Sequence, residues 1–231
     1  MSNLLKKYKF DMHVHTKETS SCGNIIGLDV ADMYKEAGYD GIVITDHYIK
    51  DFFEQFPDKT WDMKVDEFLK GFMEAKTEGQ KRGLKVILGM ELRFTDSQND
   101  FLIYGIDQEF LRENKELYLL NLYKFRELIK DKDIMIFQAH PFRAGHYVMN
   151  IESLDGIEVF NGNARHDSKN HLANDFAKEN NLIPISGSDF HEIEDLARGG
   201  VEFVEMVNSS KELVRQLKNN GVTEIIQSRR A

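Results

Sequence analysis

The sequence predicts an α/β fold in which mostly parallel strands close into a barrel, and three observations support this. Short apolar runs alternate with stretches of helical periodicity along the 231-residue chain, as in repeated βαβ units. The apolar runs lack strict polar–apolar alternation, as expected of strands covered on both faces. Polar side chains follow five of these runs, and potential ligands on so many strands favour a closed barrel over an open sheet.

The apolar runs have strand length and are bounded by glycine, aspartate, asparagine or proline. We expect strands, in chain order, at residues 8–14, 41–45, 85–90, 101–106, 134–138, 156–160, 182–186, 201–207 and 223–227. Apolar residues at helical spacing predict helices at residues 30–37, 65–81, 117–129, 166–179 and 211–219. Asp29 is the expected N-cap of the first helix, and glycines follow the ends of three helices.

Length and composition indicate a single globular domain spanning residues 1–231, with 41% hydrophobic and 30% charged residues. The apolar stretches are too short to span a bilayer, and residues 1–9 lack the apolar core of a secretory signal. A single cysteine, Cys22, excludes an internal disulfide and suits a reducing compartment. We therefore expect a cytoplasmic protein with no membrane partner.

The formal net charge of −9 bears on the class of partner. A protein that neutralises many backbone phosphates needs a basic face, so a long nucleic acid is not expected as a partner. A small anion held by metal ions and one or two arginines remains compatible with this charge.

Five of the eight histidines, together with two carboxylates, stand at the ends of predicted strands. His13 and His15 are two residues apart, so on a strand they point to the same face and can share one ion. Imidazole with carboxylate is a ligand set for Zn, Mn, Fe or Ni rather than Ca or Mg. Seven candidate ligands exceed one tetrahedral site, which implies at least two ions. The candidates are His13, His15, His47, Glu91, His140, Asp189 and His191.

A single histidine at a strand end is usually a hydrogen-bonded structural residue, and a lone His-x-His pattern often arises by chance. The joint pattern is different, because five strand ends that each carry His, Asp or Glu have no economical structural explanation. Buried charged groups need partners, and metal ions are the simplest partners for this set. The set as a whole therefore predicts a metal centre.

The order and spacing of these segments resemble the PHP (polymerase and histidinol phosphatase) family over residues 11–191. The resemblance implies a distorted (β/α)7 TIM-like barrel with a trinuclear site that uses Mn, Zn or Fe. It also implies phosphatase activity on small phosphomonoesters. The ligand groups that it implies are His13, His15, Glu91 and Asp189 for one ion, Glu91 and His140 for a second, and His47 and His191 for a third.

Two segments depart from the family pattern. Many members place a His or Asp several residues after the His-x-His motif, and here we expect Glu18 as the oxygen ligand of the third ion, with Cys22 as an alternative. A histidine that often precedes the strand after Glu91 is replaced by Asn99 and Asp100. Either Asp100 or an extra water would complete the second site, so the number of ions stays open at two or three.

The expected chemistry is hydrolysis of a small phosphorylated metabolite, since a water bridging two such cations becomes a hydroxide nucleophile near neutral pH. Arg143 is the first candidate for contact with the phosphate oxygens, because a guanidinium matches phosphate geometry. A loop salt bridge is its alternative role. His191 or His146 could protonate the leaving oxygen. Arg165, Asn161 and His146 are further candidates for substrate binding, with a helix-start charge and an Asn-Gly turn as the alternatives for the first two.

Other interpretations stay open at this point. The substrate could be a phosphodiester rather than a monoester. An amidohydrolase-like barrel acting on C–N bonds also begins with His-x-His, but no lysine stands at a strand end near His140 to serve as its carboxylated bridge. A non-catalytic, metal-binding regulatory PHP module is less favoured, because the ligand set is intact.

Overall fold

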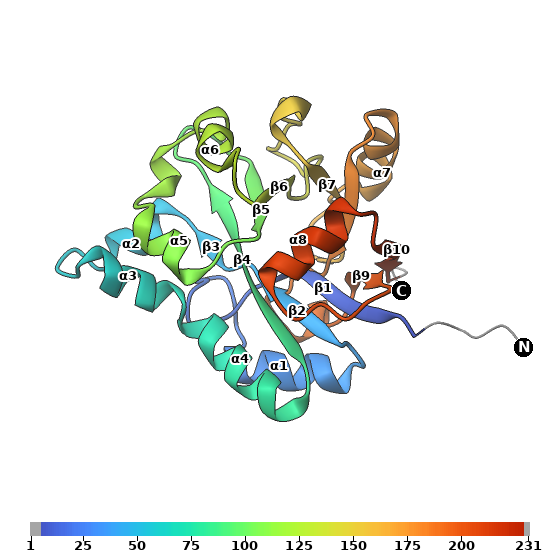
Figure 1. The fold of residues 1–231 in the computed structure, drawn as a ribbon, viewed down its shortest axis with the longest axis horizontal. Helices are drawn as coiled ribbons and strands as arrows, with labels where there is room; N and C mark the ends of the chain where they lie inside the picture. Colours follow the sequence, from blue (N-terminus) through green and yellow to red (C-terminus); the bar gives the residue numbers. More distant parts are fainter. Residues whose placement is uncertain (1–5, 229–231) are drawn as a thin grey trace, which may run out of the picture.

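The computed structural model describes residues 6–228, so the first five and last three residues of the predicted domain lie outside the described part. Across that part, ten strands form one sheet in the order β10-β9-β1-β2-β4-β5-β6-β7-β8, with β3 paired to β4. Figure 1 shows this sheet curving around a centre with helices along its outside, as an α/β barrel requires. The predicted fold class is confirmed.

The strands coincide closely with the predicted apolar runs. Their bounds are β1 (Tyr8–Val14), β2 (Gly41–Ile44), β3 (His47–Tyr48), β4 (Lys85–Arg93), β5 (Asp100–Tyr104), β6 (Met135–Gln138), β7 (Gly156–Asn161), β8 (Ile183–Gly187), β9 (Gly199–Phe203) and β10 (Val222–Gln227). The helices are α1 (Gly27–Glu36), α2 (Lys50–Glu54), α3 (Trp61–Phe68), α4 (Lys70–Arg82), α5 (Gln108–Glu113), α6 (Leu122–Ile129), α7 (Asn170–Glu179) and α8 (Ser210–Lys218). Three 3-10 turns complete the set, at Leu117–Leu119, Ile151–Ser153 and Ile193–Asp195.

The expectation of parallel pairing is wrong for three strands. β5 runs antiparallel to both β4 and β6, and β9 runs antiparallel to both β1 and β10. Residues 94–99 join β4 to β5, and this connection is too short for the crossover that parallel strands need. The remaining neighbours along the sheet, from β1 to β4 and from β6 to β8, pair in parallel as predicted.

Backbone hydrogen bonds join β1 to the segment after β8 and so close the sheet into a barrel. The amide of His15 donates to the Phe190 carbonyl at 3.0 Å, and the Phe190 amide donates to the His13 carbonyl at 3.2 Å. Val14 and Phe190 form a parallel bridge between these segments. The barrel therefore closes at the segments that carry four of the predicted ligands.

Several helix boundaries differ from the sequence prediction for local reasons. The predicted helix 65–81 divides into α3 and α4 at Leu69, and the predicted helix 117–129 is a 3-10 turn followed by α6. The Asn121 side chain caps α6 by accepting from the Lys124 amide. Helix α7 starts late because Lys169 has a left-handed backbone with φ of 49°. Asp29 lies inside the first turn of α1 instead of capping it.

Alternate residues along the strands pack into two apolar clusters. One cluster contains Ile42, Ile44 and Ile103 with residues of α1 and α4. The other contains Val43, Leu102 and Phe137 with Leu213, Val214 and Leu217 of α8. Figure 1 shows α8 lying across the strands on the side away from α1 and α4. The strands are thus apolar on both faces, which explains why their sequences lack alternation.

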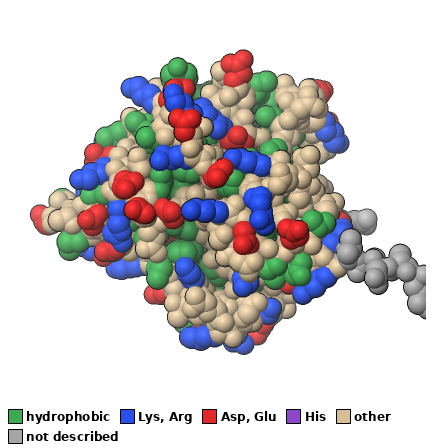
Figure 2. Space-filling model, in the orientation of Figure 1, with side chains coloured by type: hydrophobic (Ala, Val, Ile, Leu, Met, Phe, Trp, Pro, Cys, Tyr) green, Lys and Arg blue, Asp and Glu red, His purple; other side chains and the backbone are tan. Residues whose placement is uncertain are grey.

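Over the face seen in Figure 2, acidic and basic side chains are interspersed without a large basic area. No helix within residues 6–228 combines the length and the apolar character that a membrane crossing needs.

Helices α1 and α4 approach each other closely at two glycines. A Cβ atom added to Gly27 would lie 2.3 Å from the backbone oxygen of Gly71. The amide of Gly27 also donates to both carboxylate oxygens of Glu18, at 3.0 and 3.1 Å. This junction joins the segment after β1 to the outer helices and leaves no room for a side chain at residue 27.

We predict that Gly27→Ala destabilises the fold by about 1–3 kcal/mol, because the added methyl group must displace backbone of α4. Urea denaturation followed by circular dichroism measures the change in unfolding free energy. Glu36→Ala, at an exposed position of the same helix, is the matched control and is expected to be nearly neutral. Equal stability of Gly27→Ala and the control would contradict this packing.

Candidate metal centre

Seven of the eight predicted metal-site residues converge at one end of the barrel, each placed there by the end of a strand or by the residues just after it. Glu91 of β4 lies at the centre of the group. Its Oε1 is 3.3 Å from His13 Nε2 and 3.1 Å from His140 Nε2. Its Oε2 is 3.4 Å from His15 Nε2 and 2.8 Å from His47 Nδ1. One carboxylate thus faces four imidazoles, as a residue bridging two cation positions would.

Asp189 supplies the second shared carboxylate. Its Oδ1 lies 3.4 Å from Nε2 of both His13 and His15, and 3.5 Å from His191 Nδ1. Asp189 and His140 have φ values of 51° and 26°, in the left-handed region that non-glycine residues rarely adopt. Such backbone persists where the surroundings enforce it, and it turns both side chains towards the cluster.

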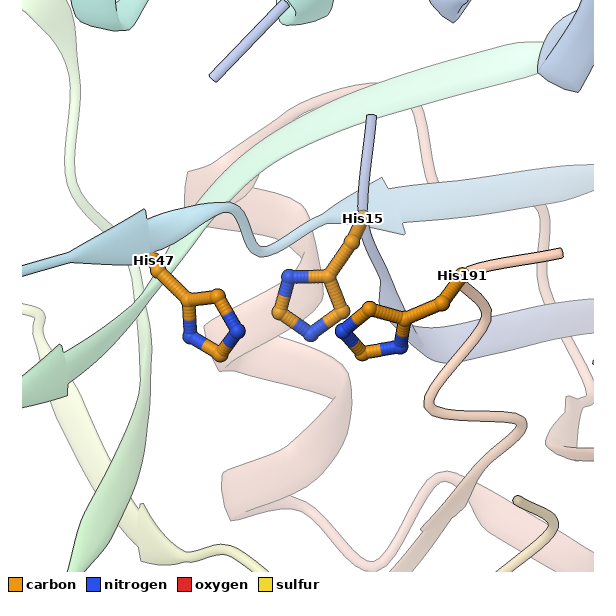
Figure 3. A group of neighbouring side chains, drawn as sticks. All are labelled: His15, His47 and His191. Carbon is orange, nitrogen blue, oxygen red and sulfur yellow. The ribbon is translucent and has the colours of Figure 1, made fainter. Parts of the chain in front are cut away.

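Three histidines form a group that we call the triple-histidine cluster: His15, His47 and His191. One ring nitrogen of each lies within 4.8 Å of the others. Figure 3 shows the His15 ring between the other two, with nitrogens of all three turned towards one another. The ring centroid of His15 is 4.3 Å from that of His47 and 4.3 Å from that of His191. This arrangement can present several nitrogen donors to one cation.

Two other groups of side chains satisfy the same distance criterion. His13, His15 and Asp189 form one, and Asp100, His140 and His146 form the other. In the second group, Asp100 also accepts two hydrogen bonds from Arg93, at 2.6 and 2.7 Å. Asp100 therefore lies beside His140, at the second cation position, for which the sequence allowed either this carboxylate or a water.

Buried atoms without hydrogen-bond partners show that these residues fit divalent cations. His13 Nε2, His15 Nε2 and Glu91 Oε2 are buried and make no hydrogen bond among the described residues. His13 Nε2 lies 3.3 Å from Glu91 Oε1, and His15 Nε2 lies 3.4 Å from Glu91 Oε2. Buried polar atoms in proteins are normally paired. Imidazole nitrogens and carboxylate oxygens are the donor set for Zn, Mn or Fe, so the unpaired atoms suit these ions.

The electrostatics of the cluster favour ionised carboxylates. Burial raises the pKa of Glu91, but His13 and His47 outweigh it and hold that pKa well below its usual range. Burial likewise opposes ionisation of Asp189, and His13, His15 and Arg143 hold its pKa well below normal. Burial, followed by His191 and His47, lowers the pKa of His15 well below 6.5. Metal ligands must be deprotonated, and these three groups meet that condition near pH 7. Burial opposes protonation of His13 and His47, but the neighbouring carboxylates outweigh it and raise the pKa of both imidazoles well above 6.5, so these two would release a proton when a cation binds.

A buried carboxylate that the sequence analysis missed orients two of the ligands. Glu158 Oε1 is 3.0 Å from His13 Nδ1, and Glu158 Oε2 accepts from the His140 amide at 2.9 Å. Because the carboxylate occupies Nδ1 of His13, Nε2 remains available to the cluster. The available signal was a lone glutamate inside the apolar run of β7.

Asp46 is a second missed carboxylate, and it holds the loop after β1. It accepts from the Thr16 amide at 2.7 Å, from Thr16 Oγ1 at 2.7 Å and from Ser20 Oγ at 2.8 Å. Burial raises the pKa of Asp46 to about 6 despite these hydrogen bonds. Ser20 Oγ also lies 3.1 Å from His15 Nδ1, so the loop fixes that ring.

The structure does not bring Glu18 to the cluster. Its carboxylate accepts from the Gly27 amide at the start of α1, where a negative charge is favourable. Cys22 lies near the metal centre instead, on the cavity wall with His47 and His191. Burial raises the pKa of the Cys22 thiol, but interactions with His191 and His47 outweigh it and bring the value to about 6. The expectation for Glu18 fails because its side chain serves a helix terminus.

The cluster opens into a cavity of about 850 Å³, and three of the four predicted substrate-contact residues line it. Arg143 lies on the wall, with Nη2 donating to Asp189 Oδ2 at 2.7 Å. Arg165 pairs with Glu192 and Asp195. His146 is half-buried, and its Nδ1 has no hydrogen-bond partner among the described residues.

Asn161 is the fourth predicted contact, and it lies behind the wall. It is buried, and its amide donates to Glu158 at 2.9 Å and to Asp189 at 3.2 Å. It also accepts from Arg143 Nη2 at 3.0 Å. The structure therefore gives Asn161 a position supporting the ligands rather than one on the cavity surface.

We predict that Glu158→Gln weakens metal binding by about 10- to 100-fold, because a neutral amide cannot match the carboxylate in orienting His13. Competition with a chromogenic chelator measures the affinity. Glu152→Gln, at an exposed position outside the cavity lining, is the matched control and should bind like the unaltered protein. If both variants bind metal equally well, Glu158 has no part in positioning the ligands.

Comparisons with known proteins agree with this architecture. The PHP domain family matches residues 11–132, and a PHP-associated family matches residues 167–222. No curated protein sequence matches the chain.

Several solved structures share the fold, and two of them are compared with this chain. A two-domain protein from Bacteroides vulgatus, described as containing a predicted PHP-like metal-dependent phosphoesterase, is 19% identical with a TM-score of 0.66. That alignment covers 94% of this chain and 64% of the other, so the chain spans less than two thirds of that protein. PsfC from Pseudomonas syringae is 16% identical with a TM-score of 0.62, covering 90% of this chain and 88% of PsfC. Since the PHP domain match alone spans more than half of the sequence, the chain belongs to the PHP domain family.

Proposed function

We propose that this chain is a metal-dependent phosphoesterase that hydrolyses a small phosphorylated metabolite, with a phosphomonoester as the substrate class. The observation that carries the proposal is the group of buried, unpaired nitrogen and oxygen donors around Glu91 at the floor of a cavity. A cavity of about 850 Å³ suits a small molecule rather than a long polymer. We further propose that residues 1–231 fold as one domain.

The site residues would hold two or three divalent cations, with Mn, Zn and Fe as the candidate metals. His13, Glu91 and Asp189 offer donors to one position, Glu91 and His140 to a second, and His47 and His191 to a third. His15 has one free nitrogen, Nε2, which can serve either the first position or the third. When bound, such ions lower the pKa of a water and neutralise charge on a phosphate.

Arg143 is the proposed phosphate-binding residue of this chain. It lines the cavity beside Asp189, so a phosphate that approached the cluster would meet its guanidinium. Its hydrogen bonds to Asn161 and Ser168 hold the side chain in place before substrate arrives. A preorganised cation next to developing negative charge stabilises a transition state without reorganisation. His146 and Arg165, on the same wall, are the proposed contacts to the rest of the substrate.

His191 is proposed either to bind a cation or to protonate the leaving oxygen, and its ring cannot do both at once. Its Nδ1 lies 2.9 Å from the Asp189 carbonyl oxygen, which can only accept, so Nδ1 is the donor. Nε2 alone remains, either to bind a cation or to pass a proton to the leaving oxygen. The ring nitrogens that face one another in Figure 3 favour the cation.

The amidohydrolase alternative finds less support in the cavity. Among the described residues, the lysine that lines it is Lys169, which precedes α7 and does not stand at a strand end beside His140. A carboxylated lysine bridging two ions is therefore not available in that position. Phosphate release from a panel of phosphorylated metabolites after loading with Mn or Zn tests the proposal. p-Nitrophenyl phosphate, its diester and dihydroorotate separate monoesterase, diesterase and C–N hydrolase activity, and turnover of dihydroorotate alone would refute it.

We predict that His13→Ala and Asp189→Ala each abolish phosphatase activity and bound metal together while the barrel stays folded. Each change removes a donor shared within the cluster. Metal content after dialysis, turnover and the circular dichroism spectrum are measured on the same sample. His171→Ala, on the exposed face of α7, is the control and should retain all three properties. Unchanged turnover in either cluster variant would refute the site.

We predict separately that Arg143→Ala raises KM for phosphoesters on the order of tenfold or more, the effect of losing a charge-assisted hydrogen bond. Bound metal should persist, because Asp189 Oδ1 faces His13 and His15 while Oδ2 faces Arg143. Steady-state kinetics and metal analysis give the two readouts. A fall in metal content with unchanged KM would instead make Arg143 a structural partner of Asp189.

A further inference from the structure

The loop between β1 and α1 places Cys22 on the wall of the cavity with His47 and His191, two members of the triple-histidine cluster. Ser20 Oγ accepts from the His47 amide at 3.1 Å, so the loop is attached to His47 on one side of the thiol. The Asn24 amide donates to the His191 carbonyl at 2.8 Å, so it is attached to His191 on the other side. The Gly23 amide donates to the Ser20 carbonyl at 2.8 Å and closes a turn around Cys22.

The turn itself is tightly held. Asp46 accepts hydrogen bonds from the Thr16 amide and from Ser20 Oγ, so it holds the loop at two points before Cys22. A Cβ atom added to Gly23 would lie 3.0 Å from the carbonyl carbon and oxygen of Thr16, so the chain passes close to its own backbone there. This construction leaves the Cys22 side chain on the cavity wall with His47 and His191.

The triple-histidine cluster contains a buried ring nitrogen that has no hydrogen-bond partner among the described residues. His15 Nε2 is buried and makes no hydrogen bond among the described residues, although nitrogens of His47 and His191 lie within 4.8 Å of the ligating nitrogen of His15. Three imidazoles supply three donors, whereas closed zinc sites take four. Glu18, the oxygen donor expected from the sequence, is bound to the Gly27 amide instead.

We propose that the Cys22 sulfur is the fourth donor of the cation site formed by His15, His47 and His191, which makes it a three-nitrogen, one-sulfur site. The inference rests on the proposed metal-dependent function and assigns a ligand to the third position. On coordination the thiol proton passes to solvent and the sulfur–metal bond forms, with no change in oxidation state. Thiolate donors favour Zn, Fe and Co over Mn, so this position should select softer ions than the carboxylate-rich positions.

The sole cysteine makes a spectroscopic test unambiguous. The metal-free full-length protein is titrated with Co²⁺, and a thiolate-to-cobalt charge-transfer band is sought in the near ultraviolet. We expect the band in the unaltered protein and its loss in Cys22→Ser, with the visible cobalt bands from nitrogen and oxygen ligands retained. Ser21→Ala, which alters an exposed neighbour in the same turn, is the matched control and should keep the band.

A second measurement does not depend on the fold of any variant. Alkylation of Cys22 by iodoacetamide in the unaltered protein should be fast without metal and slow after loading with Zn²⁺. A cobalt-loaded protein with no charge-transfer band, or alkylation unaffected by Zn²⁺, would overturn the assignment of Cys22. If phosphatase activity persisted in that case, the proposed function would stand. Failure to bind any Co²⁺ would overturn both.

Discussion

The structure depends on the balance of charge where the barrel strands end. Glu91 and Asp189 are buried among imidazoles, and each lies within 3.5 Å of at least three of them. Ionised groups in an apolar interior are costly unless charges of opposite sign compensate them. Because His13, His15 and Asp189 stand where β1 meets the segment after β8, cations bound there would also stabilise the closed barrel.

A layer of buried carboxylates behind the ligands determines how those ligands point. Asp11 accepts from the Ser188 amide at 2.9 Å and from the Tyr34 hydroxyl at 2.8 Å, which joins β1, the end of β8 and α1. Glu158 orients the His13 ring, and Asp46 holds the loop after β1 by accepting from the Thr16 amide. Partners of this kind commonly orient metal ligands and set which nitrogen of an imidazole is free.

The two sides of the cavity above the cluster differ in the kinds of side chain that line them. On one side, carboxylate oxygens of Glu91 and Asp100 lie beside the His140 ring. On the other side, nitrogen donors predominate and the Cys22 thiol stands beside them. Hard and soft donors prefer different ions, so this asymmetry offers a physical basis for distinct metals at neighbouring positions of one cavity. Arg143 lines the same cavity, where under the proposed function it would bind an anionic substrate.

The sequence by itself determined the strands, the barrel and the residues that gather at its mouth, because apolar periodicity is local and a ligand at each strand end needs no knowledge of pairing. Only the tertiary structure decided the antiparallel course of β5, β9 and β10. It also decided where the side chains of Glu18, Glu158 and Cys22 lie. Whether a side chain meets a helix amide, an imidazole ring or a cavity depends on contacts between segments far apart in the chain, which no local pattern encodes.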